Sequence, residues 1–261
     1  MRIAILTYGE YRTADSAVST WNILNTEHEV DVYVHTQTTS DSKPISKNDI
    51  TKLFKKANTC RVWLEDIDEY KNDAPPRDIH MNFRSYRFLY NKLIESKESF
   101  DFIIVNRLDT VLYIPNVNEF LLNYNKNGIY TLNDEITFEN SFIQDHFFMG
   151  SYNTISEFLK NLPTPNKLRD SHKDFGKYIL STSFTNINDN VICFHLRPNQ
   201  VKYVLETDLN NISNNFFLKI SELENEYMMA KKEQNLESNL EWCKQGLVYI
   251  CSFLENTSKM M

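Results

Sequence analysis

The chain has little glycine, proline or cysteine, and each shortage excludes a class of protein. Five glycines and seven prolines among 261 residues are too few for a disordered or low-complexity chain. Four cysteines without a Cys-x-x-Cys pair argue against a disulfide-rich fold and against a zinc site. The chain also lacks a Gly-x-Gly-x-x-Gly fingerprint and a Gly-Lys-Ser/Thr phosphate loop, so neither standard nucleotide motif is present.

Long apolar runs and an excess of positive charge are absent as well. No segment approaches the roughly 20 apolar residues of a membrane span, and the first residues are too short for a signal peptide. A formal net charge of −7 argues against nucleic acid as the main partner, although a few arginines can still hold a small anion. We therefore expect a cytoplasmic protein without a membrane span. Its free thiols are expected to be buried: Cys60, Cys193, Cys243 and Cys251.

The hydrophobic fraction of 41% is sufficient for a large core, and its distribution predicts an α/β domain. Strand-like segments alternate with helical ones in the first half of the chain, an order that predicts a largely parallel, doubly wound sheet flanked by helices. Right-handed crossovers then place the carboxyl ends of the strands on one edge of the sheet. The expected strands are 2–7, 29–35, 59–64 and 102–105, and the expected helices are 14–24, 46–57 and 79–96.

The second half of the chain is less regular. We expect one domain over residues 1–220 and a C-terminal helical extension over 221–261, whose apolar residues follow helical spacing. Within the domain, the pattern predicts strands at 129–132, 142–149, 191–196 and 201–205 and helices at 151–162 and 167–180.

The most informative motif follows the strand over 102–105. That apolar run ends abruptly in Asn106-Arg107-Leu108-Asp109, at an edge where open α/β sheets bind ligands. Arg107 and Asp109 are two residues apart, so in extended chain they point the same way. Asp109, expected to be partly open to solvent, can hold a divalent cation, and Arg107 can hold a phosphate. A simple salt bridge at a strand end is the alternative.

Two further candidates follow the first two strands. Gly9 lets the backbone approach a ligand closely, Arg12 can hold a diphosphate, and Tyr8 can stack on a base. An ordinary turn is the alternative there. His35 ends the second strand and is either a ligand for a ribose or base, or a buried histidine bonded by the backbone.

The remaining candidates lie on later segments. Arg84 and Arg87 are three apart on a helix, so they share a face that either meets phosphates or is solvated. Asp145 is either an acid or base for a hydroxyl acceptor, or part of an exposed turn. His195, at a strand end, either completes a metal site with Asp109 or is structural.

Taken in order, these motifs resemble the GT-A class of nucleotide-sugar glycosyltransferases. The likeness is to the small bacterial, phage and large-DNA-virus enzymes that make polysaccharides and glycans, and it covers about residues 1–205. The motifs are a strand followed by Gly9-x-x-Arg12, a second strand with Tyr33–Thr36, a strand ending in Arg107-x-Asp109, and Asp145-x-Phe147 before Gly150-Ser151.

The resemblance implies a GT-A-like fold and the transfer of a sugar from a nucleoside-diphosphate sugar, with UDP expected, to a glycan or other hydroxyl acceptor. It implies an Mn²⁺ or Mg²⁺ ion on Asp109 and His195, and catalysis by Asp145 and Asp109. In a viral protein, the location is the host cytoplasm. The implied nucleotide-sugar ligands are Tyr8, Gly9, Arg12, His35, Arg84, Arg87 and Arg107.

The chain departs from that class at the metal motif, where Arg107 replaces the first aspartate of Asp-x-Asp. Either Asp109 alone binds the cation through diphosphate and water, or Arg107 supplies part of the positive charge. The departure favours a second hypothesis, a non-catalytic protein that binds nucleotides or glycans. A third, a nucleotidyltransferase, is disfavoured because the first loop lacks the glycine-rich basic run that binds a triphosphate.

Overall fold

The computed structural model describes residues 1–38, 45–66, 79–133, 143–162, 184–186, 191–212 and 215–234. The chain forms two compact units, Met1–Leu196 and Arg197–Met261. This division lies before the boundary expected after residue 220, and a helix over 215–234 passes through that residue. No glycine or proline interrupts those twenty residues, so nothing in the backbone ends the helix there.

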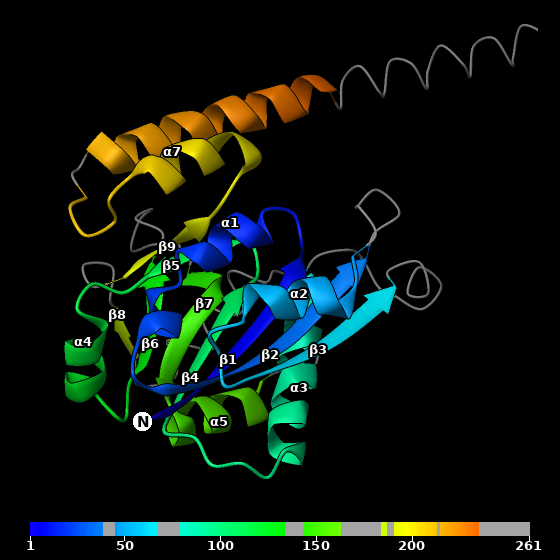
Figure 1. Cartoon of the computed structure of the whole chain (residues 1–261), viewed down its shortest axis with the longest axis vertical. Helices are drawn as coiled ribbons and strands as arrows, with labels where there is room; N and C mark the ends of the chain where they lie inside the picture. Colours follow the sequence, from blue (N-terminus) through cyan, green and yellow to red (C-terminus); the bar gives the residue numbers. More distant parts are fainter. Residues whose placement is uncertain are drawn as a thin grey trace, which may run out of the picture. The chain divides into compact units, whose positions relative to one another are not determined.

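The first unit is built on a seven-stranded sheet with the order β3-β2-β1-β4-β7-β6-β8 (Figure 1). The expected parallel half is confirmed. Strand β1 (Arg2–Glu10) pairs in parallel with β2 (Glu29–Thr38) on one side and with β4 (Phe102–Arg107) on the other, and β2 pairs in parallel with β3 (Thr59–Asp66).

The other half of the sheet contains one reversal. Strand β7 (Ile143–Ser151) runs antiparallel between β4 and β6 (Ile129–Asn133), and β8 (Phe184–Asn186) is parallel to β6. A separate two-stranded sheet joins β5 (Thr110–Tyr113) to β9 (Ile192–His195) in antiparallel. The α/β class with a mostly parallel sheet is therefore confirmed.

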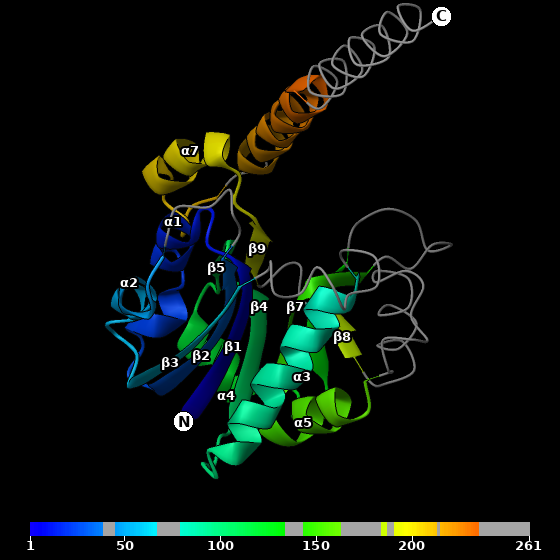
Figure 2. The same ribbon diagram turned by 90° about the vertical axis from the view of Figure 1, so that its right-hand side faces the viewer.

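Helices cover both faces of the large sheet. Figure 2 shows α1 (Ala14–Ser19) and α2 (Lys47–Leu53) on one side and α3 (Ile79–Glu95) on the other, where α5 (Tyr152–Lys160) also packs. The remaining short elements are η1 (Asn22–Asn25) and α4 (Val117–Asn123), which pack on the first side.

Alternate residues of the central strands enter two separate cores. Ile3 and Ile5 of β1 pack among the residues of α1, α2 and α4, whereas Ala4 and Leu6 pack against α3 and α5. All four side chains are fully buried. Because helices cover both faces, the strands are continuous apolar runs rather than alternating ones, which explains the sequence signal at 102–105.

Several expected elements have different bounds. Strand β1 continues to Glu10, so Tyr8 and Gly9 lie in the strand rather than in a turn. A capping box opens α2 after Ser46: the Ser46 Oγ accepts from the Asp49 backbone N–H at 3.2 Å, and the Asp49 carboxylate accepts from the Ser46 N–H at 3.2 Å. The helix expected at 167–180 lies outside the described residues.

The strand expected at 201–205 is wrong, because these residues form helix α7 (Val201–Glu206). Pro198 starts a short 3-10 turn, η4 (Pro198–Gln200), that leads into α7, and proline is favoured at such a position because its φ is already helical. Strand β9 pairs with β5 instead.

The second unit contains η4, α7 and the helix over 215–234. Arg197 makes a forked ion pair with Glu224, with nitrogen–oxygen distances of 2.9–3.0 Å, and the side-chain amide of Gln200 donates to the carbonyl oxygen of Ile220 at 3.2 Å. These contacts fasten η4 to the long helix. None of the described helices is long and apolar enough to cross a membrane.

A charged network closes the amino end of the sheet, opposite the strand ends singled out by the sequence. Asp31 is fully buried and accepts hydrogen bonds from Arg2 Nε at 2.8 Å and from Thr59 Oγ1 at 2.7 Å. Glu98 bridges Arg2 and Arg61 at 2.7 and 2.6 Å. The network pairs each buried charge, as a low-dielectric interior requires.

We expect Asp31→Asn to lower the free energy of unfolding by about 2–3 kcal/mol, because it leaves Arg2 without its buried counter-charge. Glu29→Gln is the matched control, since Glu29 faces the same guanidinium at 3.9 Å but its side chain is 66% exposed. That control should change stability by less than about 0.5 kcal/mol. Urea unfolding of both variants measures the difference, and equal losses would contradict the assignment.

Candidate functional site

The carboxyl ends of β1 and β4 form the topological switch point of the sheet. From β1 the chain moves outward through β2 and β3, and β4 then returns to the other side of β1. Crevices at such points are where open α/β sheets bind ligands. The register places Tyr8 beside Arg107, and the Leu108 N–H donates to the Tyr8 carbonyl at 2.7 Å. The expected convergence of these two strand ends is thus observed.

Arg107 and Asp109 form a two-pronged ion pair at this point. Arg107 Nε donates to Asp109 Oδ1 and Nη2 donates to Oδ2, both at 3.0 Å. The Arg107 side chain is 21% exposed, whereas that of Asp109 is 3% exposed. Asp109 is therefore not the solvent-open carboxylate expected from the sequence. The pair presents its positive end to solvent and its negative end to the interior.

The ion pair keeps both Arg107 and Asp109 in their charged forms. Burial alone raises the pKa of Asp109, but the neighbouring His195 and the charge of Arg107 outweigh it and hold that pKa well below its usual range. Burial alone lowers the pKa of Arg107, but the charge and hydrogen bonds of Asp109 outweigh it and hold that pKa above its ordinary value. Both groups stay ionised at neutral pH.

Gly9 lies against the guanidinium. A Cβ atom at Gly9 would stand 3.7 Å from Arg107 Nε, and its φ of +106° is a backbone conformation that other residues rarely adopt. Thr36 Oγ1 donates to the Gly9 carbonyl at 2.6 Å and holds this turn of the strand in place.

His195 reaches the site from the small sheet. His195 is paired with Thr110 between β9 and β5. The backbone N–H of the following residue, Leu196, donates to the Asp109 carbonyl at 2.9 Å. The His195 Nδ1 atom stands 3.6 Å from Asp109 Oδ1. The structure therefore brings together Tyr8, Gly9, Arg107, Asp109 and His195.

Helix α3 covers Tyr8 and His35, which are paired across β1 and β2. Tyr8 is 1% exposed and its hydroxyl lies 2.8 Å from that of Tyr86, so its ring is packed in the core rather than available to a base. His35 is also 1% exposed, with Nδ1 at 2.9 Å from Ser85 Oγ and Nε2 at 2.8 Å from Glu65. Of the two alternatives for His35, the structure therefore shows the buried histidine, although its partners are side chains rather than the backbone.

The two arginines of α3 have different surroundings. Arg84 approaches Glu65 at 3.5 Å and its side chain is 43% exposed. Arg87 donates to the carbonyl of Leu162, two residues beyond the end of α5, at 2.5 Å. The two arginines thus contact different parts of the protein, and their role as phosphate ligands stays a prediction.

Arg12 and Asp145 are placed only in part. Arg12 is exposed on the turn that follows β1. Asp145 belongs to β7, two residues before Phe147, which pairs with Asn106 of β4. The backbone of Asp145 therefore lies at the same edge as Arg107, while its side chain lies outside what the structure describes.

Three buried polar residues on β1, β4 and β5 were not singled out by the sequence pattern. Thr7, Asn106 and Thr110 are fully buried, and their side-chain oxygen and nitrogen atoms have no hydrogen-bond partner among the described residues. Thr7 and Asn106 are register partners on β1 and β4. Polar residues inside strands that are otherwise apolar are the signal that identifies them.

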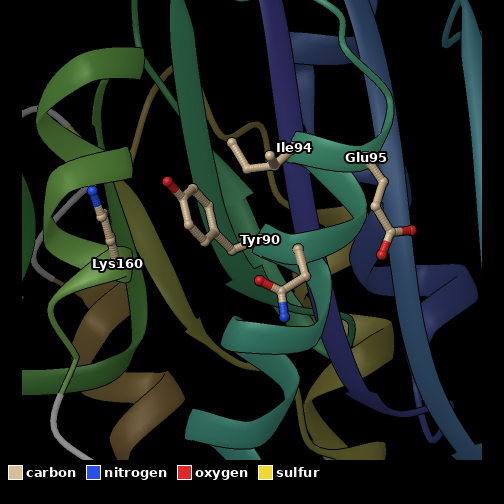
Figure 3. A pocket seen from close by; sticks show the side chains of 5 residues that line it. Tyr90, Ile94, Glu95 and Lys160 are labelled. Atoms are coloured by element: carbon tan, nitrogen blue, oxygen red, sulfur yellow. The ribbon is translucent and has the colours of Figure 1, made fainter.

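A separate hollow of about 490 Å³ lies between α3 and α5 (Figure 3). Tyr90 and Ile94 of α3 face Lys160 of α5 across it, and Asn91 and Glu95 complete its lining. It lies among the helices of the α3 and α5 side and not at the strand ends, and it has one charged group of each sign. We do not assign the site to it, because nothing there selects a ligand.

The chain resembles several solved glycosyltransferase structures. The galactosyltransferase LgtC, in complex with donor and acceptor sugar analogues, shows 10% identity and a TM-score of 0.42, over 71% of this chain and 73% of LgtC. GlyE of Streptococcus pneumoniae TIGR4 shows 11% identity and a TM-score of 0.42, over 72% of this chain and 45% of GlyE. A glycosyltransferase involved in glycosylation of the PBCV-1 major capsid shows 10% identity and a TM-score of 0.38, over 72% of this chain and 82% of that one.

No protein-family model matches the chain, and no curated protein sequence does. At 10–11% identity and TM-scores of 0.38–0.42, these likenesses assign neither a reaction nor a substrate to this chain.

We expect Gly9→Ala to lower the free energy of unfolding by about 1–3 kcal/mol, because alanine is strained at positive φ. The space itself accepts a methyl group, since the nearest atom lies at 3.7 Å. Chemical unfolding measures the change. A loss below about 0.5 kcal/mol would exclude backbone strain at this position.

Protonation of His35 should couple stability to pH. Burial lowers its pKa below the ordinary 6.5, with Arg84 adding to the effect and Glu65 opposing it. The unfolded chain then binds a proton that the folded chain does not, so this stabilisation is present above pH 6.5 and is lost as the pH falls.

Unfolding free energies at a pH of about 7.5 and about 5.5 test this coupling. The wild type should lose more stability over this interval than His35→Gln, which cannot titrate. Parallel losses in the two proteins would show that other groups carry the pH dependence.

Proposed function

We propose that the chain is a glycosyltransferase that uses a nucleoside-diphosphate sugar as donor. The observation that carries the proposal is the Arg107–Asp109 pair at the switch point, whose positive end is the part open to solvent. Arg107 Nε and one hydrogen of Nη2 are bonded to Asp109, which leaves Nη1 and the second hydrogen of Nη2 as parallel donors for a phosphate. The sequence resemblance supplies the reaction class, and the site supplies the group that would receive the diphosphate.

The donor would lie across the ends of β1 and β4. Gly9, which has no side chain, leaves the guanidinium of Arg107 uncovered, and exposed Arg12 on the following turn adds a second positive charge for the diphosphate. UDP is the expected nucleotide by resemblance. His35 and Tyr8 lie under α3, so we infer that they support the site from below rather than contact the base.

The reaction assigns each charge a place. The oxygen of an acceptor hydroxyl forms a bond to the anomeric carbon, and the bond from that carbon to the diphosphate breaks with its electron pair passing to the β-phosphate oxygen. A fixed positive group stabilises this developing charge. Because arginine stays protonated, Arg107 does so without transferring a proton.

The proton of the acceptor hydroxyl needs a base close to the acceptor. We infer that Asp145 serves this role, because its backbone lies at the edge occupied by Arg107. The acceptor is then a glycan or another hydroxyl compound. A cytoplasmic location stays a prediction from the sequence.

The first test is calorimetric titration of the full chain with UDP, GDP, CMP and TDP. We expect at least one nucleoside diphosphate to bind, and Arg107→Gln to weaken binding by about 10- to 100-fold, as for loss of a charge-assisted hydrogen bond. Arg61→Gln is the matched control. Arg61 is also a part-buried arginine paired with an acid, but it lies at the amino end of the sheet, away from the proposed site. Absence of binding by the folded wild type would exclude the proposed function.

The second test separates turnover from binding. Asp145→Asn should lower kcat by about 10²-fold or more while leaving nucleotide affinity unchanged, because a general base acts on the acceptor and not on the donor. Release of UDP from a UDP-sugar measures turnover. A wild type that binds the nucleotide but never releases it from the sugar would instead be a non-catalytic binding protein.

A further inference from the structure

The metal expected from the resemblance can be tested against the residues that would hold it. A divalent cation needs carboxylate oxygens or imidazole nitrogens with available lone pairs, facing the space that the ion occupies. At the first position of the metal motif this chain offers a guanidinium, which has no lone pair to donate. At the second position it offers Asp109.

Asp109 is poorly placed for a cation. Each of its carboxylate oxygens already accepts an N–H of Arg107 at 3.0 Å, and its side chain is 3% exposed. A cation bound to either oxygen would be held next to the positive guanidinium, which repels it. A ligand arriving from solvent meets Arg107 first, since that side chain is the more exposed of the two.

His195 does not supply the missing ligands. Its Nδ1 atom lies 3.6 Å from Asp109 Oδ1, so it adds at most one ligand beside that carboxylate. Among the described residues, no group of three or more histidine, cysteine, aspartate or glutamate side chains is arranged to hold a metal ion. The described residues of the site do not fit the implied metal.

We propose that this site binds the diphosphate of its nucleotide donor without a divalent cation, with the Arg107 guanidinium as the positive group and Asp109 as the residue that positions it. The inference rests on the proposed function. When the sugar–phosphate bond breaks, the electron pair passes to the β-phosphate oxygen and Arg107 stays protonated. Asp109 holds the fork in one orientation, with Gly9 leaving its face uncovered.

The experiment is calorimetric titration of the metal-stripped full chain with UDP, once in EDTA and once in excess Mn²⁺, with turnover of a UDP-sugar measured in parallel. If another nucleotide binds best in the earlier panel, that nucleotide and its sugar are used. The affinities and the turnover rates should agree between the two buffers within about threefold, a difference too small for a required ligand.

The outcomes separate the two proposals. Binding or turnover that requires Mn²⁺, or that rises by about tenfold or more with it, would overturn the metal-independent site and leave the glycosyltransferase intact. Absence of binding in both buffers would overturn the proposed function and this inference with it. Binding and turnover in EDTA support both.

A pair of variants tests the cause. Arg107→Asp removes the guanidinium and supplies a second carboxylate beside Asp109, so this variant should bind Mn²⁺ in a titration with the metal alone. Arg107→Asn removes the same ion pair without adding a ligand and should bind none, like the wild type. Circular dichroism and melting curves establish that both variants fold.

Wild-type binding of Mn²⁺ as tight as that of Arg107→Asp would show that Arg107 does not exclude the metal. If neither variant folds, the comparison of the wild type in EDTA and Mn²⁺ still decides the question. Asp109→Glu should retain more nucleotide affinity than Asp109→Asn, because a positioning role needs the charge opposite Arg107.

Discussion

Two opposite charges held at 3.0 Å inside the edge of a sheet determine what this site can do. Asp109 lies almost entirely within the protein, and a carboxylate there is costly unless it is matched. Arg107 matches it through two hydrogen bonds and remains partly exposed. The result is a cation that is fixed in direction and accessible from one side, which is what recognition of a phosphate group requires.

The fold provides the setting for this pair. Parallel pairing of β1 with both β2 and β4 creates the switch point, and each further contact of the site follows from that pairing. Gly9 lies close to Arg107 because β1 and β4 are neighbouring strands. Helix α3 packs on Tyr8 and His35 and keeps both side chains in the core. Sheet β5–β9 then adds His195 beside Asp109.

The sequence predicted the parallel half of the sheet well, because each of its strands is an apolar run separated by an amphipathic helix. It also predicted that Gly9, Arg107 and Asp109 converge, which requires only strand ends on one edge. It did not predict β5, a four-residue strand whose partner lies far along the chain, since no local period marks such pairing. The burial of Asp109 was not predicted for a related reason. The sequence shows a carboxylate beside an apolar strand, but not whether an ion pair with a neighbouring arginine allows it to be buried.

The short separation of Arg107 and Asp109 along the chain has a consequence for how the protein folds. Pairing of β5 with β9 closes a long loop, and contacts between distant segments tend to form late. The ion pair, by contrast, joins residues two apart at the end of one strand. It can form together with β4, before His195 arrives. The charged group at the centre of the site can therefore be neutralised early, and later assembly encloses a matched pair rather than a bare carboxylate.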